Sequence, residues 1–169
     1  IPELNYAVVS SAEIVDIQAL GNRRINSNST ATLTARFRIG SNTKTVTSYI
    51  AWLLVKGGKI KWDTKFFDLY PELKPKSNPA YYGLTLQDFI TFRANTIKWT
   101  YTNDTPTKKE ISGNEEQQRY KFITWVLQQE PVAAKQAITF SNPAYVAAGL
   151  MLEKATGKDY KTLVKELGK

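Results

Sequence analysis

Ser41 and Lys44 stand three positions apart, just before an apolar helical run, in a chain that has neither histidine nor cysteine. A serine hydroxyl becomes an effective nucleophile when a base takes its proton, and without an imidazole a Ser-His-Asp triad would need a histidine from a partner. If Ser41 is a nucleophile, the sequence therefore favours Lys44 as its base.

The residues after this pair predict a helix whose first turn carries both side chains on one face. Apolar residues recur there at spacings of three and four, as on the core-facing side of a helix, and two glycines follow as a stop signal. These residues are Val46, Ile50, Leu53 and Leu54, followed by Gly57 and Gly58.

A lysine acts as a base only when it is neutral, and its ordinary pKa is about 10.4. Burial and the positive end of a helix dipole both lower that pKa, and backbone N–H groups at the same helix end can stabilise an oxyanion. The alternative is that Ser41 caps the helix and Lys44 is a solvated first-turn residue. A chain with 9 Ser and 17 Lys contains such a spacing about once by chance, so the pair alone decides nothing.

Length and composition restrict the class of protein. The 169 residues are 42% hydrophobic and 12% aromatic, which fits one globular core or a compact two-lobed unit. No run of apolar residues is long enough for a membrane span, and we expect no targeting segment in these residues. Without His or Cys, and with no calcium-loop or phosphate-loop spacing, we predict no metal and no cofactor.

The formal net charge of +8 raises the question of an anionic partner. The lysines are scattered along the chain or lie on the outer face of a C-terminal helix, which favours a solvated surface, with attraction to an anionic surface as the alternative. Nucleic-acid binding through lysines and four tryptophans is a weaker hypothesis, because Trp52 and Trp125 lie in apolar runs and are expected in the core. We predict no nucleic-acid partner.

Strand patterns precede helical ones along the chain. Residues 4–9 and 14–20 predict a hairpin and residues 32–37 a further short strand. Helices are expected from residue 41, over 85–92, 115–129 and 143–156, and after a cap at Asp159, with surface loops at 71–83 and 99–113. So thin a sheet predicts that residues beyond Lys169 or another chain complete it.

Three segments, in this order, resemble the serine β-lactamase-like family, most closely the branch of class C β-lactamases, penicillin-binding proteins and esterases. The resemblance covers nearly the whole chain. The segments are Phe37-Arg38-Ile39-Gly40-Ser41-Asn42-Thr43-Lys44; Gly57-Gly58-Lys59-Ile60 with Asp63; and Phe140-Ser141-Asn142-Pro143-Ala144-Tyr145 with Gly149 and Glu153-Lys154-Ala155-Thr156-Gly157-Lys158.

The resemblance implies an α+β fold in which antiparallel strands accompany a mainly helical lobe, with the fold incomplete in these residues. Residues 1–40 would supply strands and residues 41–169 the nucleophile helix and helical lobe of one family domain. The implied activity is acylation of a serine by a β-lactam, a D-alanyl peptide or an ester, with Ser41 as nucleophile and Lys44 as base. The implied location is periplasmic or secreted, and the implied partner is a small-molecule or peptidyl substrate.

The family's Tyr-x-Asn motif falls on Phe140, Ser141 and Asn142. By this resemblance Asn142 would hold a substrate amide, whereas Phe140 lacks the hydroxyl that moves a proton, and Ser141 would replace it only after a shift of the loop. Loss of such a group costs on the order of 10² to 10⁴ in rate. The family's Leu-Thr-His-Thr-Ser-Gly-Leu segment falls on residues 90–96 without its histidine and glycine, and the third motif is not found.

Two interpretations follow from these departures. The chain is part of a serine hydrolase, or it is a shortened relative that binds cell-wall peptide or a protein partner without turnover.

Overall fold

The computed structural model describes residues 2–100, 104–107, 109–132 and 138–168. The chain divides into two compact units, Ile1–Gly40 and Ser41–Lys169. Each unit is described by itself.

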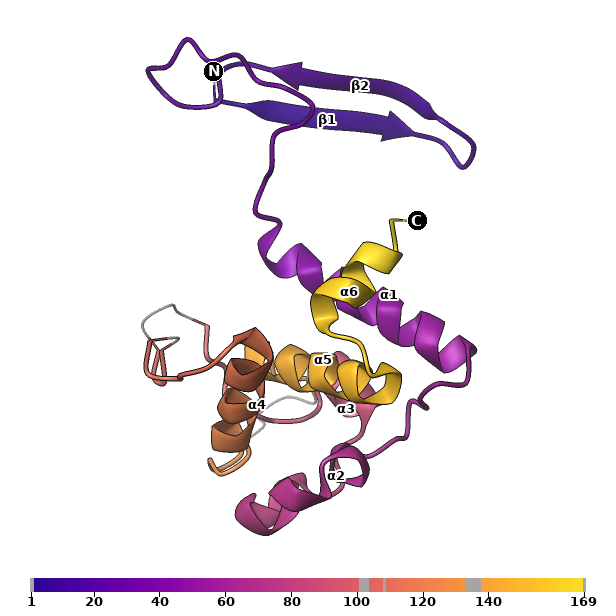
Figure 1. The fold of residues 1–169 in the computed structure, drawn as a ribbon, viewed down its shortest axis with the longest axis vertical. Helices are drawn as coiled ribbons and strands as arrows, with labels where there is room; N and C mark the ends of the chain where they lie inside the picture. The colour runs from indigo at the N-terminus through magenta and orange to yellow at the C-terminus, as the bar shows by residue number, and fades with distance from the viewer. Residues whose placement is uncertain (1, 101–103, 108, 133–137, 169) are drawn as a thin grey trace. The chain divides into compact units, whose positions relative to one another are not determined.

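The first unit is built on a hairpin of β1 (Leu4–Val9) and β2 (Ile14–Leu20), which pair antiparallel (Figure 1). The strand bounds are those that the alternating pattern predicted. Ser10 closes the turn, since its Oγ accepts hydrogen bonds from the backbone of Ala12 at 3.1 Å and of Glu13 at 3.0 Å. Within the described residues each strand has one unpaired edge, and most of the large apolar side chains on the hairpin are exposed.

The predicted third strand over residues 32–37 is wrong. Thr32 instead begins a turn, in which its carbonyl accepts a hydrogen bond from the Ala35 N–H at 3.1 Å and its hydroxyl lies 3.1 Å from that of Thr34. The Thr32 carbonyl also accepts from the Asn5 side chain at 3.1 Å. Local bonds of this kind compete with a strand ladder, which an alternating pattern alone does not reveal.

The second unit is helical, and α5 contacts α1, α2, α3, α4 and α6. Its long apolar sequence is buried on most sides, so it forms the centre on which the other helices pack. Bounds are α1 (Thr43–Lys56), α2 (Phe66–Leu69), α3 (Leu86–Ile90), α4 (Glu115–Val126), α5 (Asn142–Thr156) and α6 (Tyr160–Glu166), with 3₁₀ turns η1 (Gly40–Asn42), η2 (Pro71–Lys76) and η3 (Pro79–Tyr81).

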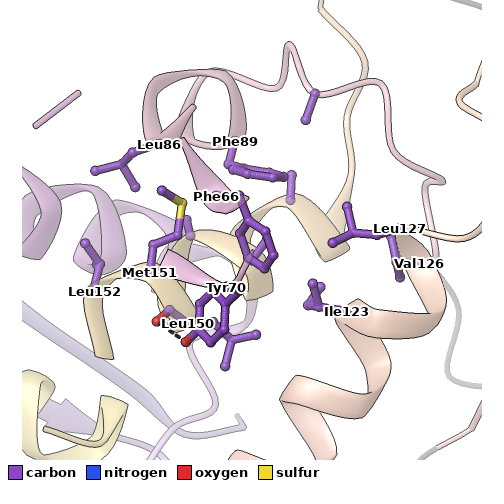
Figure 2. Close-up of a cluster of buried hydrophobic side chains, with 14 of the residues drawn as sticks. Phe66, Tyr70, Leu86, Phe89, Ile123, Val126, Leu127, Leu150, Met151 and Leu152 are labelled. Carbon is purple, nitrogen blue, oxygen red and sulfur yellow. Dashed lines mark hydrogen bonds between the residues drawn. The ribbon is translucent and has the colours of Figure 1, made fainter. Parts of the chain in front are cut away.

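The core gathers aromatic side chains of α2 and α3 against α5 (Figure 2). Phe66 stacks on Tyr70 with ring centroids 5.0 Å apart and meets Phe89 edge-on at 5.8 Å. The buried Tyr70 hydroxyl donates a hydrogen bond to the Leu150 carbonyl at 2.8 Å, so the polar tip of this ring is satisfied inside the core.

Caps explain why three predicted helices begin where they do. Thr85 and Asn114 form capping boxes with Asp88 and Gln117, and Asp159 accepts the Thr162 N–H at 2.8 Å.

Other expectations about the second unit differ from the structure. The helix predicted over 85–92 ends at Ile90, because Phe92 adopts a φ of 58°. The predicted loop at 71–83 contains η2 and η3 and buries Leu73 and Tyr81. Trp52 was expected in the core but is 45% exposed.

Within the part of the chain that the structure describes, no helix combines the length and the hydropathy that crossing a membrane requires.

Candidate functional site

Ser41 and Lys44 lie at the start of α1. Gly40 has a φ of 52°, a backbone conformation that suits glycine, and the chain passes from it through η1 into the helix. Ser41 is exposed and lies in η1, two residues before α1 rather than in its first turn as predicted, while Asn42 holds the N-cap position without a side-chain cap. Lys44 Nζ donates a hydrogen bond to Ser41 Oγ at 3.0 Å, so the two side chains meet.

Asn142, the first residue of α5, joins this pair from the other helix. Its Oδ1 accepts a hydrogen bond from Lys44 Nζ at 2.8 Å, and its Nδ2 donates to the Trp99 carbonyl at 3.0 Å. The carbonyl partner fixes which way the amide points, since only Nδ2 can donate to it. Asn142 thus positions the Lys44 amine, and it keeps a second N–H and a second lone pair for another group.

Burial lowers the pKa of the Lys44 ammonium below its ordinary value. The N-terminal end of α1 acts in the same direction, because the helix dipole disfavours a cation there. In the neutral amine, one N–H can bind Asn142 Oδ1 while the lone pair accepts the Ser41 proton. The arrangement can therefore activate a serine without histidine.

An aromatic wall borders the lysine. Lys44 Nζ lies 5.1 Å from the ring centroid of Phe140 and 5.8 Å from that of Tyr145. Phe92 packs against both rings, with centroids 5.2 Å and 5.1 Å away. Rings at these distances favour the ammonium form, which opposes the effect of burial on the Lys44 pKa. Phe140 is 44% exposed, so it forms an open side of the site.

Ser141 serves as the N-cap of α5. It is buried, and its hydroxyl lies 2.7 Å from the Thr96 hydroxyl, donates to the Ile97 carbonyl at 2.7 Å and accepts from the Ala144 N–H at 3.2 Å. These contacts hold the residue inside the protein. The structure thus brings together Ser41, Lys44, Phe140 and Asn142 and places the Ser141 hydroxyl in the cap.

Sequence reasoning missed Tyr145. Its hydroxyl donates to the Ile90 carbonyl at 2.9 Å and lies 3.2 Å from Ser48 Oγ, which in turn donates to the Lys44 carbonyl. A usable signal exists, because Asn142 and Tyr145 are three apart on one helix and therefore share a face. Phe92 and Trp99 gave no such signal.

A pocket of about 240 Å³ lies beside Lys44 and is mainly apolar. Lys44 and Asn142 border it together with Tyr145, Gly149 and Tyr160. A larger pocket of about 670 Å³ is lined by other residues and includes none of the five predicted site residues. Within the described residues no group of three or more His, Cys, Asp and Glu side chains is placed to hold a metal ion.

The family model for Beta-lactamase matches residues 1–167. The chain belongs to the Beta-lactamase family. The resemblance inferred from the three sequence segments is thereby confirmed.

Solved structures agree on the fold. D-alanine carboxypeptidase AmpC from Burkholderia cenocepacia superposes with a TM-score of 0.72 at 20% identity, over 98% of this chain and 41% of that one. A class C beta lactamase from Rhodobacter sphaeroides superposes with a TM-score of 0.73 at 17% identity, over 99% of this chain and 43% of that one. A D-stereospecific amidohydrolase from Streptomyces sp. superposes with a TM-score of 0.62 at 22% identity, over 89% of this chain and 44% of that one.

These likenesses confirm the predicted α+β class, with antiparallel strands and a mainly helical lobe. The chain spans less than half the length of each of these three solved structures.

Proposed function

We propose that this chain carries the nucleophile and base of a serine acyl-transfer enzyme of the β-lactamase and penicillin-binding type. The observation that supports this most directly is that Lys44 Nζ contacts both Ser41 Oγ, at 3.0 Å, and Asn142 Oδ1, at 2.8 Å. A partly buried amine with a lowered pKa, held against a serine hydroxyl, has the geometry of an activated nucleophile.

In the proposed reaction Ser41 Oγ attacks the substrate carbonyl carbon while the neutral Lys44 amine takes the hydroxyl proton. The Ser41 backbone N–H supplies one donor to the resulting oxyanion. When the carbonyl's bond to the leaving nitrogen or oxygen breaks, the leaving atom receives the proton from the Lys44 ammonium. Water then attacks the acyl-serine ester while the Lys44 amine takes a proton from it, and the resulting ammonium returns that proton to Ser41 Oγ as the acid leaves.

The proposed substrates are a β-lactam, a D-alanyl peptide or an ester, with no cofactor and no nucleic acid. Phe140 offers no hydroxyl, so Lys44 has to serve both proton transfers in this mechanism. Asn142 orients the amine and, with its second N–H, is proposed to hold a substrate carbonyl. We propose a periplasmic or secreted location, following the family.

The second candidate function is a binding module for cell-wall peptide or a protein partner. Phe140 favours it, because a ring without a hydroxyl stands where the family motif has tyrosine. The small apolar pocket beside Lys44 and Asn142 would still accept a ligand without turnover.

We also propose that the sheet of the first unit receives further strands, from a segment following Lys169 or from a second chain. The exposed apolar side chains of both strands support this, as does the one unpaired edge on each strand within the described residues.

Fluorophosphonate labelling tests the enzyme proposal against the binding module. We expect one adduct, mapped to Ser41 by peptide mass, that disappears in Ser41→Ala and persists in Ser11→Ala, a matched change at an exposed serine of the hairpin turn. Absence of any adduct on folded protein that still binds cell-wall peptide would reject the enzyme in favour of the binding module.

A further inference from the structure

The basic residues are distributed unevenly between the two units. Residues 1–40 contain four Arg and no Lys, whereas residues 41–169 contain two Arg and 17 Lys. Solubility requires only charge, which lysine supplies as well as arginine. Arginine differs in presenting a planar fork of donors that binds oxyanions in a bidentate manner.

Three of these arginines border one pocket. Arg23, Arg24 and Arg36 line a concave site of about 420 Å³ in the first unit, together with Ser27 and Ser29. Glu3 and Ala35 complete the lining, so the pocket carries three cations against a single carboxylate.

The loop that carries the site is held by its own hydrogen bonds. The Arg23 N–H donates to the Ser29 carbonyl at 2.8 Å, and the Ser29 N–H donates to Ser27 Oγ at 3.0 Å. Asn26, at the tip between them, has a φ of 61°, a left-handed conformation that asparagine tolerates better than most residues. Arg23 and the two serines therefore belong to one closed loop.

The Glu3 carboxylate offsets only part of the positive charge of this pocket, which is left with a formal charge of +2. Within the described residues none of the three arginines, all of them exposed, forms a salt bridge. Like charges gathered around one concave surface repel one another, and a bound anion relieves that repulsion.

We propose that the Arg23–Arg24–Arg36 pocket is a binding site for a phosphate group. The guanidinium forks match the oxygens of a tetrahedral phosphate, and the Ser27 and Ser29 hydroxyls add donors of the right size. The site uses none of the residues of the serine chemistry, so the phosphate-site proposal and the enzyme proposal can be tested separately.

Titration calorimetry with inorganic pyrophosphate tests the proposal on the whole chain. We expect saturable one-site binding that weakens about tenfold or more when the three arginines become lysines, because charge is kept while bidentate geometry is lost. The matched control replaces Lys154, Lys158 and Lys161 with glutamine, which removes three charges elsewhere and should change the affinity less than about twofold. Circular dichroism establishes that each variant is folded.

Three outcomes would overturn the site. They are no binding to folded parent protein, equal binding by the triple-lysine variant, or an equal loss in the Lys control, which would show that binding does not depend on this pocket in particular. Flotation with phosphatidylglycerol vesicles distinguishes the source of the phosphate. Arginine-dependent flotation assigns it to a lipid headgroup, and pyrophosphate binding without flotation assigns it to a soluble phosphate.

Discussion

Lys44 Nζ and Asn142 Oδ1 lie 2.8 Å apart, although 98 residues separate them in the chain. This hydrogen bond ties the start of α1 to the start of α5. The Asn142 amide is in turn held by the Trp99 carbonyl. The position of the proposed base thus depends on three segments that are distant in sequence.

Replacing Asn142 by aspartate should change the behaviour of the base. A carboxylate at hydrogen-bond distance favours the ammonium form, so the Lys44 pKa rises and less neutral amine is present at a given pH. We expect fluorophosphonate labelling of Ser41 at neutral pH to slow by about tenfold or more, since one unit of pKa is a factor of ten.

Asn28→Asp is the matched control, because Asn28 is exposed and lies in the first unit. It should label at the parental rate. An Asn142→Asp variant that is folded and labels as fast as the parent would contradict the positioning role.

The pH dependence of labelling follows from the lowered pKa of Lys44. The neutral amine is the base, so the rate should rise with pH and level off once the proton has left. Because burial lowers the pKa, the midpoint should lie below the ordinary lysine value of about 10.4. Labelling rates measured across a series of pH values give this midpoint. Lys44→Arg, which stays protonated, should abolish the rise. A pH-independent rate would exclude lysine as the base.

Phe140→Tyr should restore a missing proton carrier. The Phe140 ring already lies 5.1 Å from Lys44 Nζ, so a phenol at this position adds a hydroxyl to the open side of the site. General acid–base groups contribute about 10² to 10⁴ in rate, and a tenfold or greater gain in ester hydrolysis is expected from a partly aligned one. Phe37→Tyr, at an exposed position of the first unit, is the control. Equal rates in both variants and the parent would show that the tyrosine hydroxyl is not what limits the reaction.

Gly149, within α5, and Gly157, at its C-cap, provide opposite predictions for stability. A Cβ on Gly149 would meet Tyr160 at 3.7 Å, an ordinary contact, whereas Gly157 has a φ of 68° with no atom within 4 Å. Gly149→Ala should raise the free energy of unfolding by about 0.5–1 kcal/mol, since alanine is the better helix former.

Gly157→Ala should instead lower the free energy of unfolding by about 1 kcal/mol through backbone strain alone. Urea unfolding measures both. A loss of stability in Gly149→Ala would mean that α5 packs more tightly there than this structure shows.

Local features explain which parts of the fold the sequence could predict. The hairpin follows from alternation on either side of a turn closed by Ser10. Helices α3, α4 and α6 begin at side-chain caps whose residue types are readable in advance, and α5 follows the cap Ser141 and carries Pro143 as its second residue. In each case the stabilising contact lies within a few residues in the chain.

The parts that could not be predicted depend on distant contacts. Residues 32–37 alternate like a strand, but Thr32 is engaged by Asn5 and by its own turn. Phe92 and Trp99 adopt positive φ values of 58° and 43°, which their residue types do not favour and only the surrounding packing can impose. The pairing of Asn142 with Lys44 belongs to the same class, since family resemblance named both residues without implying their contact.

Intact-mass analysis after incubation with a reporter penicillin tests the central claim most directly. We predict a single acyl adduct on the parent protein, with the mass of the opened lactam, that is absent from a folded Ser41→Ala variant. Unmodified parent protein, or an adduct that persists in Ser41→Ala, would contradict the assignment of Ser41 as the nucleophile.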